Sequence, residues 1–398
     1  MTPSTSPVLP GSTLGILGSG QLGRMLTAAA RQLGYRVHVY SPEPDSPAGQ
    51  LADREVVGAY ADTEAVAAFA QTVDVLTFEF ENIPSASAAA AQAHTLVRPE
   101  PQLLHIAQHR LREKLWLREH GFPVAEFRPV ATQDELRAAV AELGCPCVLK
   151  TAGFGYDGKG QVRLRTPDDA AAAWAKLELP ATSPEGAVAV LEQWVSFEME
   201  CSVVGARDVN GAVELYAPAE NIHVDHILDL SVVPARMSEV TTLRAQSLAR
   251  GVLEALDAVG VVGVEMFLTL QGELLINELA PRVHNSGHWS IEGAVTSQFE
   301  QHLRAVCGLP LGSAEQLSPA AMANLLGDLW LDASGTPREP DWGALLAHPD
   351  VKLHLYGKRQ PRRGRKMGHI TALDIDAHTA LQGVIAARAA LGGGNFGG

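Results

Sequence analysis

The chain has 398 residues, of which 46% are hydrophobic and 19% are charged, and this balance is typical of a globular protein with two to three domains. Its 45 acidic side chains outnumber its 31 basic ones, so the net charge is −14. This charge argues against nucleic acid or a membrane surface as a general partner, and we expect neither. No apolar run approaches the roughly 18 residues of a membrane span. The sparse cysteines suit a reducing compartment, so we expect a cytoplasmic protein.

The first hundred residues alternate short apolar runs with helical periodicity. Residues 13–44 (TLGILGSGQLGRMLTAAARQLGYRVHVYSPEP) predict a strand, a glycine turn, a helix and a second strand. Apolar residues recur at helical spacing from Leu22 onward, and Gly34 stands where a helix stop belongs. Residues 73–78 predict a later strand. This alternation favours a parallel sheet with covering helices.

The glycine turn itself, GSGQLG, matches the pattern G-x-G-x-x-G between a strand and a helix. Backbone N–H groups in such a turn can approach a phosphate. A dinucleotide site would also need an acid at the end of the second strand, where flanking prolines make Glu43 a poor candidate. The turn therefore favours the phosphate of a substrate. A nicotinamide cofactor and a purely structural turn are the alternatives.

Two further boundaries follow from composition. The first unit ends near residues 99–101, and residues 102–120 predict one amphipathic helix. A central block of mostly strand patterns then runs to a Pro/Gly/Ser-rich stretch at 309–319. The predicted domains are residues 1–105, 106–310 and 311–398.

The segment VGVEMFLTLQGELLINELAPRVHNSGH carries the strongest functional signal. Two apolar runs flank Gln271-Gly272, which predicts a hairpin whose two-residue turn is closed by Leu270 and Glu273. In that register Glu265 lies opposite Glu278, with Cβ atoms about 4.5–5.5 Å apart. Two carboxylates so close repel unless a cation or a shared proton compensates, and Mg²⁺ accepts such ligands. The alternative is a longer turn, or one glutamate that points to solvent.

A second glycine-rich loop, KTAGFGYDGKG, follows the apolar strand that ends at Lys150. It is not a Walker A sequence, because the order differs and no helix follows. Four glycines and two lysines between strands suit a flap over nucleotide phosphates, and Lys159 would offset their charge. An exposed hairpin is the alternative. Downstream, the backbone of residues 192–195 could bind adenine, and Glu200 could bind ribose hydroxyls.

Together these features resemble the ATP-grasp enzymes, and more closely the 5-(carboxyamino)imidazole ribonucleotide synthetases, the ATP-dependent carboxylases of purine biosynthesis. The motifs that carry the resemblance are GILGSGQLGRM, FEFENIP, GYDGKGQ, INELAPRVHNSGHW and GRKMGH, which spread from residue 15 to residue 369. The resemblance implies a fold of the α/β and α+β classes. It comprises a biotin-carboxylase-like, Rossmann-like domain (1–105), an ATP-grasp domain (106–310) with a flap subdomain at about 125–200, and a small C-terminal domain (311–398). It also implies a homodimer.

The resemblance further implies roles for single positions. The nucleotide-contacting positions are Arg110, Lys150, Gly153, Gly155, Tyr156, Asp157, Gly158, Lys159, Gly160, Glu192, Gln193, Trp194, Val195, Glu200, His223, Asn277 and Glu278. Glu265 and Glu278 would hold Mg²⁺ beside ATP. Many ATP-grasp enzymes add an asparagine two positions after the second glutamate, where this chain has Ala280, so only two protein carboxylates are assigned to the metal.

On the side of the second substrate, 5-aminoimidazole ribonucleotide, the corresponding positions are Gln21, Leu22, Glu79, Tyr156, Arg282, His284, Asn285, Ser286, Lys358 and Arg365. Glu81 could replace Glu79, because alternate residues of FEFE share one strand face. Residues 351–373 hold seven basic residues and no acid. Such a run is typical of a solvated face, but it also suits the phosphate of a ribonucleotide.

The implied reaction converts ATP, bicarbonate and 5-aminoimidazole ribonucleotide to ADP, phosphate and 5-(carboxyamino)imidazole ribonucleotide through carboxyphosphate. Arg282 would bind bicarbonate or carboxyphosphate, while Lys150 and Lys159 neutralise the β/γ charge. His284, ahead of Tyr156, is the candidate to orient the amine or move its proton. The alternatives are a formate-using glycinamide ribonucleotide transformylase, a biotin carboxylase, a nicotinamide oxidoreductase and a non-catalytic nucleotide-binding regulator.

Overall fold

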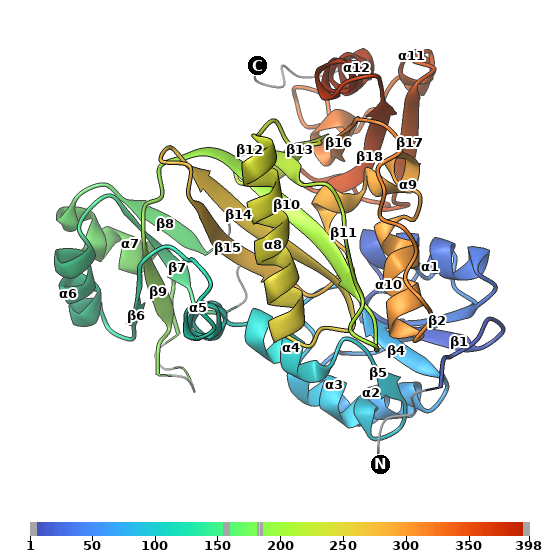
Figure 1. Cartoon of the computed structure of the whole chain (residues 1–398), viewed down its shortest axis with the longest axis horizontal. Helices are drawn as coiled ribbons and strands as arrows, with labels where there is room; N and C mark the ends of the chain where they lie inside the picture. Colours follow the sequence, from blue (N-terminus) through green and yellow to red (C-terminus); the bar gives the residue numbers. More distant parts are fainter. Residues whose placement is uncertain (1–5, 154–159, 181–182, 184–185, 393–398) are drawn as a thin grey trace.

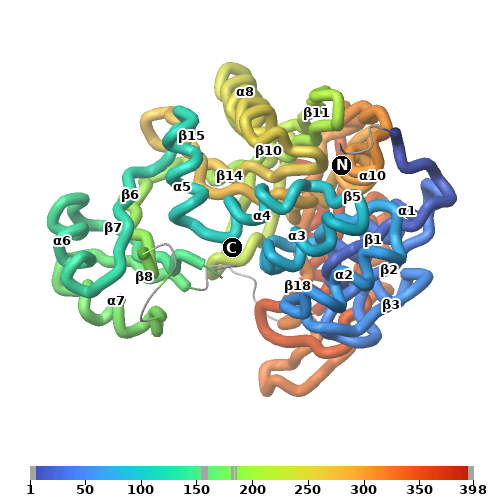
Figure 2. Tube along the Cα trace, turned by 90° about the horizontal axis from the view of Figure 1, so that it is seen from below, coloured from blue at the N-terminus to red at the C-terminus, as the bar shows by residue number. Residues whose placement is uncertain are grey.

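The structure is a computed structural model that describes residues 6–153, 160–180, 183 and 186–392. Three β-sheets organise these residues (Figure 1). The first sheet belongs to the N-terminal domain, the second to a lobe on the opposite side of the molecule, and the third lies between them and continues into the C-terminal part (Figures 1 and 2). None of the helices in these described ranges is both long and apolar enough to cross a membrane.

The N-terminal sheet is parallel and has the strand order β3-β2-β1-β4-β5, which confirms the predicted parallel α/β unit. Its elements are β1 (Thr13–Leu17), α1 (Gln21–Gln32), β2 (Arg36–Ser41), β3 (Arg54–Val57), α2 (Thr63–Ala70), β4 (Val75–Phe78), α3 (Ser85–Gln92) and β5 (Leu96–Val97). The strand order reverses between β1 and β4. Ligands of open α/β sheets bind at such a reversal, beyond the carboxyl ends of the strands.

The single helix predicted over residues 102–120 is wrong. The structure has two helices, α4 (Pro101–Ala107) and α5 (Arg110–Glu119). Between them His109 is extended and pairs with Gly153, while the amide of Arg110 donates to the carbonyl of Ala152 at 2.7 Å. These tertiary hydrogen bonds outweigh helical periodicity, and they place the start of α5 against the second lobe.

The second lobe contains a four-stranded sheet in the order β6-β9-β7-β8. Its elements are β6 (Phe127–Val130), α6 (Gln133–Leu143), β7 (Cys147–Thr151), β8 (Gln161–Leu164), η1 (Pro167–Asp169), α7 (Ala170–Lys176) and β9 (Ala189–Gln193). β7 and β8 are antiparallel neighbours, so the predicted flap connects them. We call this part, residues 127–193, the flap lobe. Residues 154–159 of the flap lie outside the described residues.

The largest sheet contains nine strands, eight of them in the order β15-β14-β10-β12-β13-β16-β18-β17, while β11 pairs with β10. Its strands are β10 (Phe197–Arg207), β11 (Val213–Leu215), β12 (Ala219–Val224), β13 (Ile227–Val233), β14 (Gly260–Thr269), β15 (Leu274–Ala280), β16 (Ala320–Leu326), β17 (Val351–Leu355) and β18 (Lys366–Leu373). Its helices are α8 (Glu239–Ala255), η2 (Asn285–Gly287), α9 (Ser290–Gly293), α10 (Gln298–Val306), η3 (Gly327–Trp330), α11 (Trp342–Leu346) and α12 (Ala377–Ala390). Because β16 pairs with β13, the predicted boundary at 310 falls within one continuous sheet.

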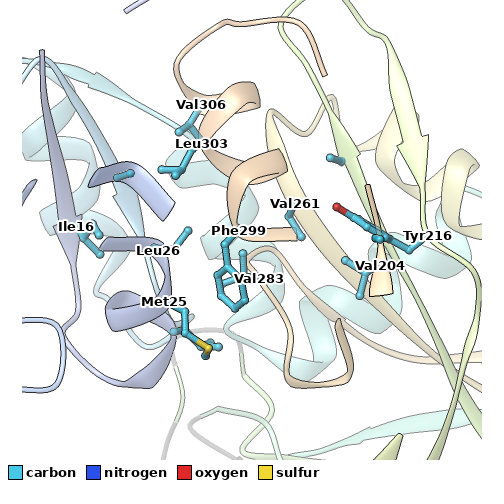
Figure 3. Packing of buried hydrophobic residues seen from close by; sticks show 14 of the residues in the cluster. Ile16, Met25, Leu26, Val204, Tyr216, Val261, Val283, Phe299, Leu303 and Val306 are labelled. Atoms are coloured by element: carbon cyan, nitrogen blue, oxygen red, sulfur yellow. The ribbon is translucent and has the colours of Figure 1, made fainter. Parts of the chain in front are cut away.

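A buried apolar cluster joins the N-terminal domain to this large sheet (Figure 3). Met25 and Leu26 of α1 lie beside Phe299 and Leu303 of α10, and the cluster continues to Val261 on β14. Full burial of each such side chain stabilises the fold by about 1.5–3 kcal/mol. The cluster therefore fixes the crevice of the parallel sheet relative to the β14–β15 hairpin.

The turn of that hairpin differs from the prediction. Gln271-Gly272 does not form a two-residue turn closed by Leu270 and Glu273. Instead the amide of Thr269 donates to the carbonyl of Glu273 at 2.8 Å, and the amide of Gly272 donates to the carbonyl of Thr269 at 2.9 Å. The loop therefore holds three residues, because Leu270 does not pair with Glu273.

The predicted opposition of Glu265 and Glu278 is nevertheless confirmed. Met266 pairs with Ile276, whereas Glu265 pairs with Glu278, so Asn277 is an extra residue on β15. This β-bulge shifts the register by one position and offsets the longer turn. The bulge, which the sequence did not reveal, restores the pairing that a shorter turn would have produced directly.

We predict that Gly272→Ala lowers the free energy of unfolding by about 1–2 kcal/mol, because Gly272 has φ +80° and a left-handed conformation costs other residues that much. No atom within 4 Å would contact the added Cβ, so the effect is one of backbone strain alone. Urea unfolding measures the change. The control is Gly383→Ala within α12, which should be neutral or stabilising because alanine favours a helix. Equal stability of the wild type and Gly272→Ala would contradict the strain.

Candidate active site

A cavity of about 1140 Å³ is lined by residues of the N-terminal domain, the flap lobe and the large sheet. The structure brings most of the predicted site residues together around it. Those lining it are Gln21, Leu22, Glu79, Arg110, Lys150, Gly153, Gly160, Glu192, Gln193, Trp194, Val195, Glu200, His223, Glu265, Asn277, Glu278, Arg282, His284 and Asn285.

Three predicted substrate residues are not among those lining this cavity. Ser286 is fully buried behind it. Lys358 Nζ donates to the carbonyl of Lys366 at 2.7 Å, and Arg365 Nη1 donates to the carbonyl of Gln360 at 2.8 Å. Lys366, a neighbour in the same basic segment that was not singled out, does line the cavity. Five predicted flap residues lie outside the described residues: Gly155, Tyr156, Asp157, Gly158 and Lys159.

The pKa values of the two facing glutamates of the hairpin shift in opposite directions. Burial disfavours the charged form of Glu265, but His284 Nε2 lies 2.9 Å from its Oε1. This hydrogen bond, together with the nearby positive charges of the site, lowers the pKa of Glu265 to about 2. Burial, and then the charge of Glu265, raises the pKa of Glu278, although Arg110 Nη1 lies 3.5 Å from Glu278. A second cation beside the pair would relieve this repulsion.

The donor set fits Mg²⁺. Within the described residues, no three His, Cys, Asp or Glu side chains are grouped as a metal site, so the hairpin offers two carboxylates. Mg²⁺ is commonly held by one or two carboxylates while substrate phosphates and water complete its octahedron. Glu265 and Glu278 would supply those two ligands.

Cations gather around one buried carboxylate next to the hairpin, where Arg110 contacts both Glu278 and Glu192. Glu192 on β9 accepts hydrogen bonds from the Arg110 guanidinium and from Lys150 Nζ, the latter at 3.0 Å. Burial opposes ionisation of Glu192, but these cations and Lys114 hold its pKa well below the ordinary value. Burial and the Arg110 charge lower the pKa of Lys150 to about 8. The excess of positive charge here suits a polyphosphate.

Two charged residues that the sequence analysis missed lie beneath this cluster. Glu113 and Lys114 of α5 are both buried, at 3% and 0% exposure. Glu113 accepts a hydrogen bond from the Leu279 amide at 3.2 Å, and Lys114 Nζ donates to the Ile276 carbonyl at 3.3 Å, so both tie α5 to β15. Their spacing of three and four residues from Arg110 places all three on one helix face. That spacing was the available signal.

The glycine turn after β1 holds a carboxylate of the protein. The amides of Gly20 and Gly23 donate to Glu79, the latter at 2.7 Å. A Cβ at Gly18 would lie 2.1 Å from Glu79 Cγ, so this glycine makes room for the side chain. The interpretation that these amides bind a phosphate is therefore corrected, since Glu79 already occupies them.

The second glutamate of FEFE has a different partner. The Arg282 guanidinium donates to Glu81, and Arg282 Nη1 also donates to the carbonyl of Val283 at 3.1 Å. Burial lowers the pKa of Arg282, but the charge and hydrogen bond of Glu81, together with the charges of Glu278 and Glu79, raise it above the ordinary value. Arg282 is thus a permanent cation between the N-terminal domain and the hairpin. Glu81 positions this arginine, so Glu79 and Glu81 are not interchangeable.

A Rossmann-like domain, a flap lobe and a sheet with paired carboxylates define an ATP-grasp enzyme, and the family model of the ATP-grasp domain matches residues 115–299. The ribonucleotide synthetase preATP-grasp domain matches residues 12–108, and the phosphoribosylaminoimidazole carboxylase C-terminal domain matches residues 320–383. The N5-carboxyaminoimidazole ribonucleotide synthases of Brucella melitensis and Bacillus subtilis are 46% and 45% identical to this chain. Each alignment covers 92% of the chain, and they cover 97% and 92% of the two relatives. The chain belongs to the N5-carboxyaminoimidazole ribonucleotide synthase family.

Solved structures agree. A crystal structure of an N5-carboxyaminoimidazole ribonucleotide synthetase bound to ADP has a TM-score of 0.88 and 42% identity, covering 96% of this chain and 98% of that one. The Aspergillus clavatus enzyme in complex with ADP and 5-aminoimidazole ribonucleotide has a TM-score of 0.85 and 33% identity, with the same coverage. The family and fold expected from the sequence are confirmed.

We predict that Glu192→Gln destabilises the protein by about 3–5 kcal/mol at neutral pH, because it leaves buried cations without their partner. The pKa of this carboxyl is depressed in the folded state, so its contribution is present above the ordinary value of 4.5 and is lost as the pH falls through the folded pKa. Urea unfolding at several pH values should show the difference from the wild type shrinking in acid.

The matched control is Glu142→Gln, which removes an exposed partner of Arg128 and should leave the stability unchanged. A Glu192→Gln protein as stable as this control would contradict the proposed role of the buried cluster.

Proposed function

We propose that this site carboxylates 5-aminoimidazole ribonucleotide, using ATP and bicarbonate, to give 5-(carboxyamino)imidazole ribonucleotide, ADP and phosphate. The observation that carries the proposal is the opposition of Glu265 and Glu278 in a cavity that is also lined by Arg110, Lys150, Arg282 and Lys366. Membership of the synthase family supports the choice of substrates, and the Aspergillus clavatus complex supports binding of the nucleotide and the ribonucleotide in one enzyme.

ATP occupies the side of the cavity next to the flap lobe in this proposal. Lys150 and Arg110 lie where they can neutralise the phosphates, and Lys159 of the flap would add to them. Mg²⁺ held by Glu265 and Glu278 would neutralise charge on the transferred phosphoryl group and the departing ADP. The backbone of residues 192–195 binds adenine, beside an Arg163 guanidinium that stacks on the Trp194 ring at 3.7 Å.

Bicarbonate binds at Arg282 in this proposal. Bicarbonate is a poor electrophile, and attack of its oxygen on the γ-phosphate converts it to carboxyphosphate. Arg282 stabilises bicarbonate and the γ-phosphate as they approach each other. Its ion pair with Glu81 orients the guanidinium, which remains positively charged. Closure of the flap keeps water from carboxyphosphate while carbon dioxide is released to the amine.

The ribonucleotide occupies the crevice of the N-terminal sheet. Gln21, Glu79 and Asn285 line this end of the cavity. Burial raises the pKa of Glu79, and the amides of Gly23 and Gly20 with the charges of Lys358 and Arg282 offset part of that increase. Lys358 therefore influences this end of the cavity through its charge. We assign the ribonucleotide phosphate to the basic segment 358–366, with Lys366 in the cavity. The homodimer and the cytoplasmic location are further proposals, which rest on family membership.

We predict that 5-aminoimidazole ribonucleotide stimulates ADP release when bicarbonate and Mg²⁺ are present. A coupled ATPase assay checks this, with glycinamide ribonucleotide plus formate as the control pair, which should give no stimulation. Glu278→Gln should nearly abolish turnover, because it removes one of two carboxylates from the metal. Stimulation by formate and glycinamide ribonucleotide alone would favour a transformylase instead.

We predict that Lys366→Met raises the KM for the ribonucleotide about tenfold or more, since loss of a charge-assisted hydrogen bond costs about 1.5–3 kcal/mol. Steady-state kinetics with varied ribonucleotide measure this. Arg365→Met, in the same segment but outside the cavity lining, is the comparison and should have the smaller effect. An unchanged KM in both variants would favour the alternative that the basic segment is only a solvated face.

A further inference from the structure

A row of polar side chains crosses the core of the large sheet, starting from the paired glutamates. Glu265 on β14 is the cross-strand partner of Ser202 on β10, and Asn221 on β12 is the partner of Ser231 on β13. β14, β10, β12 and β13 are consecutive neighbours in this sheet. Ser202, Asn221 and Ser231 are buried, with at most 5% exposure. Burying polar groups is costly unless they are hydrogen-bonded, so their partners matter.

The loop after β15 completes the row. Ser286 of this loop accepts a hydrogen bond from the Ser202 hydroxyl at 2.7 Å. Its own Oγ lies 2.8 Å from Nδ1 of His284, and Nε2 of His284 lies 2.9 Å from Oε1 of Glu265. An uninterrupted chain of hydrogen bonds therefore leads from the core of the sheet to a carboxylate of the proposed metal site.

An amide fixes the direction of this series. The Ser231 hydroxyl donates to Oδ1 of Asn221 at 3.1 Å, and Nδ2 of Asn221 donates to Ser202 Oγ at 2.9 Å. An amide nitrogen only donates, so Ser202 must accept there and use its single proton toward Ser286. Ser286 must then use its own proton toward His284. Nδ1 of His284 is consequently an acceptor, and the ring proton sits on Nε2, where it points at Glu265.

We propose that Ser231, Asn221, Ser202 and Ser286 form a hydrogen-bond relay that locks His284 in the Nε2–H tautomer and thereby positions Glu265 for its cation. The identity of the cation rests on the proposed function above. Hydrogen bonds aligned in one direction polarise each other, so the relay strengthens the last bond, from His284 to Glu265. Fixing the tautomer of a histidine through its other nitrogen is a general way to set its orientation.

The relay changes the role of His284. Both ring nitrogens are hydrogen-bonded within the protein, which leaves neither for the substrate amine in this arrangement. The backbone of His284 is also fixed, because its amide donates to Gln298 Oε1 at 2.8 Å and its carbonyl accepts from Gln298 Nε2 at 2.7 Å. His284 is thus a positioning residue for Glu265, and the expectation that it moves the amine proton is replaced.

The test interrupts the relay with Ser202→Ala and compares it with Ser87→Ala. Ser87 is equally buried and also donates one hydrogen bond, to the Tyr60 carbonyl in the N-terminal domain, but it is outside the relay. Nitrogen-15 spectra of labelled histidine report the tautomer of each of the 14 histidines, and the His284 signals are assigned by their loss in His284→Asn. The second readout is the dissociation constant of Mn²⁺ for the enzyme–ADP complex.

We expect the wild type and Ser87→Ala to show the Nε2–H tautomer at His284. In Ser202→Ala the Nδ1–H form should appear, and Mn²⁺ binding should weaken about tenfold or more, as when other supporting partners of metal ligands are removed. Ser231→Ala, at the far end, should act in the same direction with a smaller effect, and it replaces Ser202→Ala if that variant does not fold.

An Nδ1–H tautomer in the wild type would overturn the proposal, as would a relay variant that matches Ser87→Ala in both readouts. These results are distinguishable from failure of the proposed function. A wild-type enzyme that binds no Mn²⁺ would contradict the metal site, and the tautomer would then decide the relay by itself.

Discussion

Two like charges held face to face are the constraint on which this structure depends. Glu265 and Glu278 are cross-strand partners at the wall of the cavity, and their repulsion is only partly met by His284 on one side and Arg110 on the other. Coulomb repulsion at such a separation is strong where water is scarce. In the proposed function, a divalent cation bound with the phosphates of ATP would relieve this repulsion.

The neighbouring elements hold that hairpin in place through hydrogen bonds and ion pairs. Helix α5 is tied to β15 through Glu113 and Lys114, and its first residue, Arg110, reaches Glu192 in the flap lobe. One charge cluster therefore joins α5, β15 and β9 at this part of the cavity. On the other side, Arg282 pairs with Glu81 of the N-terminal domain, and the apolar contact of α1 with α10 supports that junction.

Some of the site was predictable because its signals are local. The paired glutamates lie in the two strands of a hairpin, Lys150 lies near the end of β7, and Arg282 follows β15, so apolar periodicity and the turn place each of them. Other parts were not predictable. The break at His109 depends on hydrogen bonds to the flap, and the burial of Ser286 and the entry of Lys366 into the cavity depend on packing between distant segments. Periodicity within one segment contains no information about those partners.

The sequence by itself determined the domain types, the motifs that mark the family and the opposition of two acids across a hairpin. The tertiary structure decided how that opposition arises, through a three-residue turn compensated by the bulge at Asn277. It also decided that Glu79 fills the glycine turn and that Ser202, Asn221 and Ser231 align behind Glu265. Register between strands and contacts between domains are set by the summed packing of the whole chain, so residues far apart in sequence acquire a shared role only after the fold has brought them together.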